Sequence, residues 1–293
     1  MVGLGQAMNT VQAKDIGRVL RTSFELLKAY PKSLYHGFRY KDTFSDIETY
    51  CMFIGYPRSG HSLIGSLLDA HPDVIVAQEL DALKFLNVGF RREQILYLLL
   101  EKSRLFAESG GKHGKYNYRV PNQWQGRFRR LRVIGDKKGW SSTLRLRAKP
   151  SLLDKLRKTF NVKLRFLHVV RNPYDTISTM FIKSDNWSLE ETIEHYFILC
   201  ETVSEVKRRL KEEEVFELRH EDFIANPREY LERLCRFLGV DASEDYLKDC
   251  AGIVFKNPHR SRFDVKWDLK LIELVKARSL SFPFLKGYSY EER

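Results

Sequence analysis

The 293-residue sequence has no long hydrophobic run, although 43% of its residues are hydrophobic. The longest apolar stretch runs from Ile95 to Leu100, far short of the roughly 18 residues that a membrane-spanning helix needs. The first ten residues are neither basic nor followed by a long apolar core, so they do not resemble a secretory signal. These absences predict a cytoplasmic protein without stable membrane insertion.

Cysteine is also scarce. The four cysteines are far apart in the chain, at Cys51, Cys200, Cys235 and Cys250. They form no pair with the spacing of metal ligands, and their neighbours are mostly apolar, so we predict reduced cysteines inside the core. The sequence also lacks an acidic cluster suited to holding a divalent cation. We therefore expect no bound metal.

Acids are nearly missing from one segment of this basic chain, whose net charge is +12. Between Lys112 and Lys149 there are twelve Lys or Arg residues and a single acid, Asp136. Such a block predicts either a solvated basic face or a site for a polyanionic ligand. No nucleic-acid-binding motif accompanies the block, so nucleic acid is not expected as a partner.

From residue 49 onward, short apolar runs alternate with helical patterns. Buried strands are predicted at 51–54, 131–134, 163–170 and 215–218, and helices at 62–70, 92–108, 189–211 and 227–238. The alternation predicts an α/β fold with a central parallel sheet flanked by helices. In such sheets ligands bind beyond the carboxyl ends of the strands.

Residues 1–48 precede this core and are predicted to form a helical leader to a main domain of residues 49–293. A helix is predicted from about Arg18 to Ala29, ending before Pro31 because proline disfavours helical conformation in the residue ahead of it. Its apolar residues are expected to pack on the domain rather than to lie on a membrane. They are Val19, Leu20, Phe24 and Leu27.

The segment from Gly55 to Ser62 reads Gly-Tyr-Pro-Arg-Ser-Gly-His-Ser and lies between a predicted strand and a predicted helix. Its spacing is that of a phosphate-binding P-loop, with His61 where a nucleotide triphosphatase has lysine. Glycines let backbone N–H groups point at one anion, the helix N-terminus adds its dipole, and an arginine adds a charged fork. The anion-binding candidates are Arg58, Ser59, Gly60, His61 and Ser62. The missing lysine disfavours a kinase, which uses it on the β- and γ-phosphates.

This loop and the helix after it, which continues as Leu67-Leu68-Asp69-Ala70-His71-Pro72-Asp73-Val74, resemble the 5′-phosphosulfate loop of one enzyme family. The family is the sulfotransferases that use 3′-phosphoadenosine-5′-phosphosulfate (PAPS). Its 3′-phosphate motif is similar to Val169-Val170-Arg171-Asn172-Pro173-Tyr174-Asp175, and its late strand–helix unit is similar to His220-Glu221-Asp222-Phe223-Ile224-Ala225-Asn226-Pro227. The resemblance runs from about residue 50 to 240. It is nearest to the protein-tyrosine sulfotransferase branch and its bacterial relatives.

The resemblance implies a P-loop-like sulfotransferase fold and metal-independent transfer of a sulfuryl group from PAPS to a hydroxyl or amine. Bacterial relatives in natural-product pathways favour a small-molecule acceptor over a protein tyrosine. Two alternatives stay open: a P-loop-type kinase, and a non-catalytic module that binds anions or nucleic acid. The oligomeric state is not indicated.

For the 3′-phosphate, the resemblance implies a bidentate contact from Arg171, with a hydroxyl donor on the next helix at Ser178 or Thr179. The alternative for Arg171 is a structural ion pair with Asp175 or Glu221. Two further arginines, Arg260 and Arg262, are expected either to close over the 3′-phosphate or to lie on a solvated face.

For the chemical step, the resemblance implies that Glu79 is the base. A surface salt bridge to Lys84 is the alternative role for Glu79, and His61 is the rival base. Lys137 and Lys138 are both candidates for the lysine beside the sulfuryl group, which Arg58 also contacts. Residues 80–125 and 187–194 are expected to line the acceptor pocket. The aromatic residues Tyr116, Tyr118 and Trp124 would either stack on the acceptor or pack internally.

Overall fold

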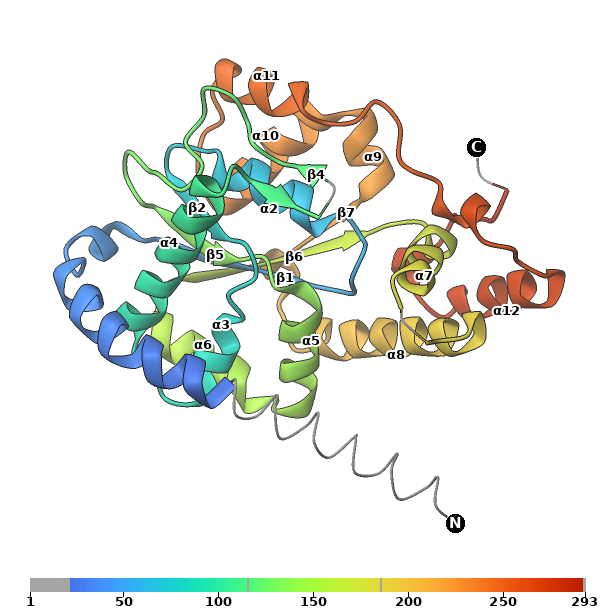
Figure 1. The fold of residues 1–293 in the computed structure, drawn as a ribbon, viewed down its shortest axis with the longest axis horizontal. Helices are drawn as coiled ribbons and strands as arrows, with labels where there is room; N and C mark the ends of the chain where they lie inside the picture. The colour runs from blue at the N-terminus through green and yellow to red at the C-terminus, as the bar shows by residue number, and fades with distance from the viewer. Residues whose placement is uncertain (1–21, 115, 185, 292–293) are drawn as a thin grey trace, which may run out of the picture.

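Five parallel strands form the centre of the computed structural model, which describes residues 22–114, 116–184 and 186–291 (Figure 1). Their order across the sheet is β2-β5-β1-β6-β7. The strands are β1 (Thr49–Ile54), β2 (Val74–Ala77), β5 (Val133–Asp136), β6 (Lys163–Val170) and β7 (Val215–Arg219). The predicted α/β class with a parallel sheet is confirmed.

Helices cover both faces of this sheet. They are α2 (His61–Asp69), α3 (Ala82–Asn87), α4 (Arg92–Glu108), α5 (Gly139–Ala148), α6 (Ser151–Phe160), α7 (Pro173–Ile182), α8 (Leu189–Lys207), α9 (His220–Ala225), α10 (Pro227–Leu238), α11 (Glu244–Gly252) and α12 (Leu269–Ser279). A two-stranded hairpin, β3 (Lys112–His113) and β4 (Tyr116–Asn117), lies outside the sheet. Among the described helices, none is both long and apolar enough to cross a membrane.

The alternation of side chains along β1 explains the two layers of helices. Tyr50, Met52 and Ile54 pack in a core shared with α3, α4 and α6. Cys51 and Phe53 point the other way, into a core shared with α2, α10 and α11. Because both faces are covered, every residue of β1 is buried.

Most predicted elements form as expected, and the helix at 92–108 and the strand at 163–170 have the bounds that the sequence predicted. The edge strand β2 was not predicted. It contains four residues and follows α2 after a tight turn, in which the N–H of Val74 donates to the carbonyl of His71. A strand this short gives little periodicity to detect.

The N-terminal helix corrects two sequence predictions. It does not end before Pro31 but continues through residue 39. Packing against α4 outweighs the local preference: the ring of His36 stacks on that of Tyr97, and the amide of Gln94 donates to Ser33. Phe24 and Leu27, predicted to pack on the domain, are 58% and 73% exposed because the opposite face of the helix makes the contact. Val19 and Leu20 lie outside the described residues.

The basic block is not one surface in the folded chain. The segment runs through β5 from the amino end of that strand to its carboxyl end. Arg129, Arg130 and Arg132 therefore lie at the opposite end of the strands from Lys137 and Lys138. Seven of its described side chains are neutralised by acids from elsewhere, in the pairs Arg129–Asp73, Arg130–Asp46, Arg132–Glu48, Lys137–Glu79, Lys138–Glu79, Arg145–Asp81 and Arg147–Glu205. The hypothesis of a single polyanion site built by the whole block is wrong.

Gly135 tests the close approach of β1 and β5. A Cβ at this position would lie 2.3 Å from both the carbonyl oxygen and the Sγ of Cys51. Backbone atoms cannot give way, so Gly135→Ala should lower the free energy of unfolding by about 3 kcal/mol or prevent folding. The matched control is Gly252→Ala at the end of α11, where an added Cβ meets nothing within 4 Å. Chemical denaturation showing equal effects of the two substitutions would contradict this packing.

Candidate functional site

The order of the strands brings the candidate residues to one edge of the sheet. β1 lies between β5 and β6, so the loop that follows β1 lies between Lys137, which follows β5, and Arg171, which follows β6. Glu79 follows β2 beyond the lysine. Because all five strands are parallel, their carboxyl ends meet at this edge.

The backbone of the loop from Gly55 to Ser62 has three residues with positive φ, Gly55 (134°), Arg58 (69°) and Gly60 (101°). Gly60 is required twice over, because an added Cβ would also lie 2.4 Å from the ring of His220. Ser59 is buried and its hydroxyl donates to the carbonyl of Tyr56 (3.1 Å). The Arg58 side chain is exposed. Such a turn before a helix N-terminus is suited to binding an anion.

Lys137 is the buried cation beside this loop, with 2% of its side chain exposed. Its ammonium donates to the hydroxyl of Ser62 (2.9 Å) in the first turn of α2 and to Glu79 Oε1 (2.8 Å). The stem of the lysine passes across Gly65, where a Cβ would lie 2.7 Å from Lys137 Cγ. A glycine inside a helix is unfavourable by about 1 kcal/mol relative to alanine, and here it makes room for the lysine.

Glu79 forms ion pairs with both candidate lysines, and Lys138 Nζ lies 2.9 Å from its Oε2. The alternative pairing with Lys84 is wrong, because Lys84 pairs with Glu25 (2.7 Å). Burial raises the pKa of Glu79, but the charges of Lys137 and Lys138 outweigh it and hold the pKa at about 2. The carboxylate is therefore ionised at neutral pH.

The position of Glu79 depends on its own left-handed backbone and on hydrogen bonds that fix the turn after it. Glu79 itself has a φ of 64°, and the next turn is held by Asp136, whose carboxylate accepts from the N–H groups of Leu80 (3.1 Å) and Ala82 (2.7 Å). Burial raises the pKa of Asp136 to about 6, in spite of these hydrogen bonds. Asp136 thus links the end of β5 to the turn that carries Glu79.

Arg171 is a buried cation whose contacts are all uncharged. Its guanidinium, in a residue that is 7% exposed, donates to the carbonyls of Arg58 (3.2 Å) and His259 and lies near the hydroxyls of Thr179 (3.4 Å) and Ser261 (3.3 Å). Its Nε has no hydrogen-bond partner among the described residues. Burial lowers the pKa of Arg171, while Asp175 and Glu221 raise it from a distance.

The alternative roles of Arg171 in ion pairs with Asp175 or Glu221 are wrong. Asp175 accepts instead from Arg262 Nη1 (2.5 Å), and both side chains of that pair are buried. Glu221 accepts from the N–H of Asn172 (2.9 Å) and the hydroxyl of Tyr288 (2.7 Å). No carboxylate of the described residues lies within ion-pair distance of Arg171.

The two hydroxyl candidates on α7 separate clearly. Thr179 Oγ1 lies beside Arg171 and 2.9 Å from Ser261 Oγ. Ser178 is fully buried and accepts a hydrogen bond from the indole N–H of Trp267 (3.0 Å). The structure therefore places Thr179, and not Ser178, with the arginine. Arg260 is exposed, whereas Arg262 is buried in its ion pair with Asp175. The alternative of a solvated face is therefore wrong for Arg262.

His61 is buried beside the loop. The residue is 8% exposed, and its Nε2 has no hydrogen-bond partner among the described residues. The ring packs closely against Gly139, where an added Cβ would lie 2.5 Å from His61 Cε1. Burial, followed by the charge of Lys137, lowers its pKa to about 3. The imidazole is therefore neutral and packs beneath the loop.

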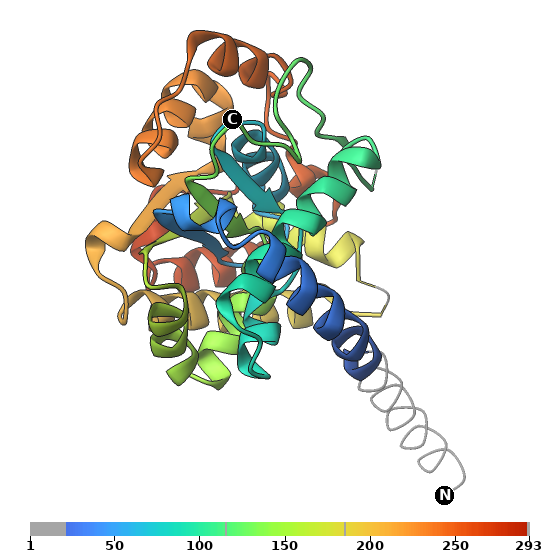
Figure 2. The same cartoon turned by 90° about the vertical axis from the view of Figure 1, so that its left-hand side faces the viewer.

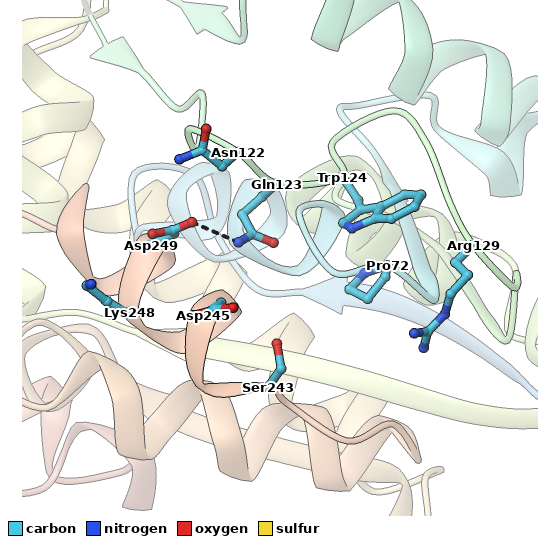
Figure 3. Close-up of a pocket in the computed structure, with 9 residues that line it drawn as sticks. All are labelled: Pro72, Asn122, Gln123, Trp124, Arg129, Ser243, Asp245, Lys248 and Asp249. Carbon is cyan, nitrogen blue, oxygen red and sulfur yellow. Dashed lines mark hydrogen bonds between the residues drawn. The ribbon is translucent and has the colours of Figure 1, made fainter.

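Two cavities lie elsewhere on the surface. One, of about 510 Å³, is lined by Pro72, Trp124 and neighbours from α11 (Figure 3). It lies at the far end of α2 from the loop, because the N–H of Trp124 donates to the carbonyl of Ala70. A shallow cavity of about 400 Å³ is lined by Trp187, Glu190, Glu191, Glu194, His195 and Ile198 on α8 and the loop before it. Tyr116 and Tyr118 stack on each other, with ring centroids 6.0 Å apart.

Sequence reasoning missed four residues that the fold brings to the site. Ser261 and His259 come from a segment almost ninety residues after Arg171, and their sequence context gave no signal. Asp136 was noted only as the single acid of the basic block and Gly65 was not singled out, because their importance depends on contacts between distant residues. Among the described residues, no three His, Cys, Asp or Glu side chains are grouped as a metal site would require.

Comparisons with known proteins identify the family and the fold. Residues 52–245 match the sequence profile of the Sulfotransferase family. The fold is similar to that of a sulfotransferase domain from the curacin biosynthetic pathway, with a TM-score of 0.50, 15% identity and coverage of 80% of this chain and 98% of that one. It is also similar to the sulfotransferase STF9 from Mycobacterium avium, with a TM-score of 0.50, 10% identity and coverage of 93% and 86%. No curated protein matches by sequence.

The neutral state of His61 makes stability dependent on pH. Its pKa is about 3 in the folded protein and 6.5 ordinarily, so the unfolded chain binds more protons below pH 6.5 and stability is lost as the pH falls. Between pH 6.5 and 5 this contributes a loss of about 2 kcal/mol. Urea denaturation should show that His61→Gln reduces the pH dependence by this amount. An unchanged dependence would contradict the buried, neutral imidazole.

Proposed function

The chain belongs to the sulfotransferase family, and we propose that it moves the sulfuryl group of PAPS to a hydroxyl or amine of a small-molecule acceptor. The observation that carries this proposal is the pair of buried cations on either side of the loop, Lys137 and Arg171. A donor with phosphate groups at both the 3′ and 5′ positions presents anions to two such sites at once.

The surroundings of Arg171 fit the 3′-phosphate. A buried guanidinium without a carboxylate partner is unfavourable until an anion neutralises it. The unpartnered Nε of Arg171 and the adjacent hydroxyls of Thr179 and Ser261 are donors suited to phosphate oxygens. The carbonyl of His259 accepts from the same guanidinium, so the segment before Ser261 must shift for a phosphate to bind there.

The 5′-phosphosulfate would bind at the loop, where the exposed Arg58, the hydroxyl of Ser62 and the start of α2 face the same edge of the sheet as Lys137. Lys137 is held by Glu79 in this structure. An incoming anion competes with that carboxylate for the lysine. When it succeeds, the pKa of Glu79 rises toward its usual range, and the carboxylate becomes a better proton acceptor.

Glu79 would then act as the base. The acceptor oxygen or nitrogen attacks sulfur as its proton passes to Glu79, the bond from sulfur to the bridging phosphate oxygen breaks, and 3′,5′-bisphosphoadenosine leaves with the electron pair. Lys137 and Arg58 stabilise the charge that spreads over the sulfuryl oxygens. His61 is less suited to the role of base, because its ring is buried beneath the loop.

The shallow cavity on α8 is the candidate surface for the acceptor. The ring of Trp140, two residues after Lys138, lies 6.3 Å from that of His195, and the ring of Trp187 lies 4.8 Å from that of His195. This aromatic group extends from the cavity to α5, the helix that begins directly after Lys138. An aromatic and aliphatic floor with glutamates around it favours an acceptor that carries a ring and no negative charge.

Transfer of radiolabelled sulfate from PAPS to a library of phenols, alcohols and amines, in the presence of chelator, tests the reaction. Glu79→Gln should lower turnover about 10²–10⁴-fold, the usual contribution of a positioned base. Its donor affinity should be retained or improved, because Lys137 and Lys138 lose their competing partner.

The matched control is Glu232→Gln, an exposed carboxylate on α10 that should leave turnover unchanged. Absence of any labelled product from the wild-type protein would contradict the proposed reaction. Wild-type turnover by Glu79→Gln would reject only the assignment of the base.

A further inference from the structure

The N-terminal helix, residues 22–39, has a second apolar face, which is exposed. We name it the outer stripe, and it consists of Phe24, Leu27, Pro31, Leu34, Tyr35 and Phe38. The spacing of three or four residues places all six along one side of the helix. Their exposure is high for large apolar residues: 73% for Leu27, 60% for Tyr35 and 78% for Phe38.

The opposite side of the same helix packs against the rest of the protein. Ser33 and Gly37 are buried there, and a Cβ on Gly37 would lie 2.9 Å from the backbone of Glu93. Leu26 and Ala29 pack against the core that contains α4. The outer stripe is therefore not needed for packing, and a contiguous exposed apolar patch of this kind marks an interaction surface.

The helix lies on the outside of the molecule, at the lower left in Figure 1 and toward the viewer in Figure 2. Its 18 residues make a ridge about 27 Å long. A ridge does not enclose a ligand. It is suited to contact an extended surface along the whole length of the helix.

The charges beside the outer stripe are mostly positive, and the exposed acid Asp42 lies next to Lys41 at its C-terminal end. Glu25 pairs with Lys84, and Lys32 pairs with Glu101, so both are neutralised by the body of the protein. Lys28, Arg39 and Lys41 have no acidic partner among the described residues, and Lys28 lies over the ring of Phe24 (4.3 Å). These three cations would repel one another if two copies of the chain paired through the stripe. They would be attracted by an anionic surface.

We infer that the outer stripe binds reversibly to the surface of an anionic lipid bilayer, with its apolar side chains in the interface and Lys28, Arg39 and Lys41 near the lipid headgroups. An apolar ridge bordered by cations is the arrangement of helices that lie in the plane of a bilayer. The remaining side of such a helix normally faces water, and here the body of the protein covers it. This is adsorption at the interface and requires no segment that crosses the membrane.

Sedimentation of the full chain with vesicles tests this inference. The protein should bind vesicles of about one part phosphatidylserine to three parts phosphatidylcholine, and much more weakly to phosphatidylcholine alone, because each basic residue near an anionic surface contributes about fivefold. The double substitution Leu27→Gln and Phe38→Gln should lower binding at least a hundredfold, because two large side chains no longer gain by leaving water. Replacing Lys28, Arg39 and Lys41 with Gln should remove most of the dependence on phosphatidylserine.

The matched control replaces two equally exposed leucines on the far side of the chain, Leu269 (81% exposed) and Leu280 (85%), with Gln, and it should bind vesicles as the wild type does. All these positions are on the surface, so circular dichroism should show an unchanged fold. The inference is overturned if the wild type does not sediment with anionic vesicles, or if the control loses binding as much as the stripe variant. It is also overturned if the wild type is a dimer that the stripe substitutions convert to a monomer.

Discussion

Parallel pairing of β1 with β5 on one side and with β6 on the other is the constraint on which the whole site depends. It sets the separation between a lysine and an arginine that are 34 positions apart in the chain, and it puts the loop from Gly55 to Ser62 between them. The pairing itself depends on close backbone approach, which Gly135 permits opposite Cys51. Helices α2 and α7 then start where the strands end, so their N-termini and hydroxyl groups face the same edge.

A buried cation lies on each side of the loop, Lys137 on one side and Arg171 on the other. Two cations are buried, which is unfavourable without a partner. On the β5 side, Glu79 is the partner of Lys137, and it is positioned by its own left-handed backbone and by the hydrogen bonds that Asp136 accepts from the next turn. On the β6 side, Arg171 has only carbonyls and hydroxyls, because Asp175 and Glu221 are committed elsewhere. Both arrangements favour the entry of an anion, one by exchange and the other by direct neutralisation.

The sequence predicted the parts that depend on local patterns. Buried strands, the helix at 92–108, the loop with two glycines and the arginine after a strand are all readable from nearby residues. Long-range geometry was not readable. The choice between Ser178 and Thr179 required the position of Trp267, and the partners of Glu79 required the order of β2 and β5. The prediction from the basic block failed for the same reason. Its residues are close in sequence, but β5 runs through the block and separates them in space. Pro31 misled because tertiary packing outweighed a local preference for ending the helix.

The central claim is that Arg171 recognises the 3′-phosphate of a nucleotide whose 5′ group lies at the loop. Calorimetry of 3′,5′-bisphosphoadenosine and of adenosine 5′-monophosphate, with the wild type and with Arg171→Ala, measures this contact directly in the presence of chelator. The wild type should prefer the bisphosphate by about 2–5 kcal/mol, and the variant should lose that preference while it keeps its affinity for the monophosphate. Retained binding of the monophosphate also shows that the variant is folded. If Arg171→Ala discriminates between the two nucleotides as the wild type does, the 3′-phosphate is recognised elsewhere and the account of this site is wrong.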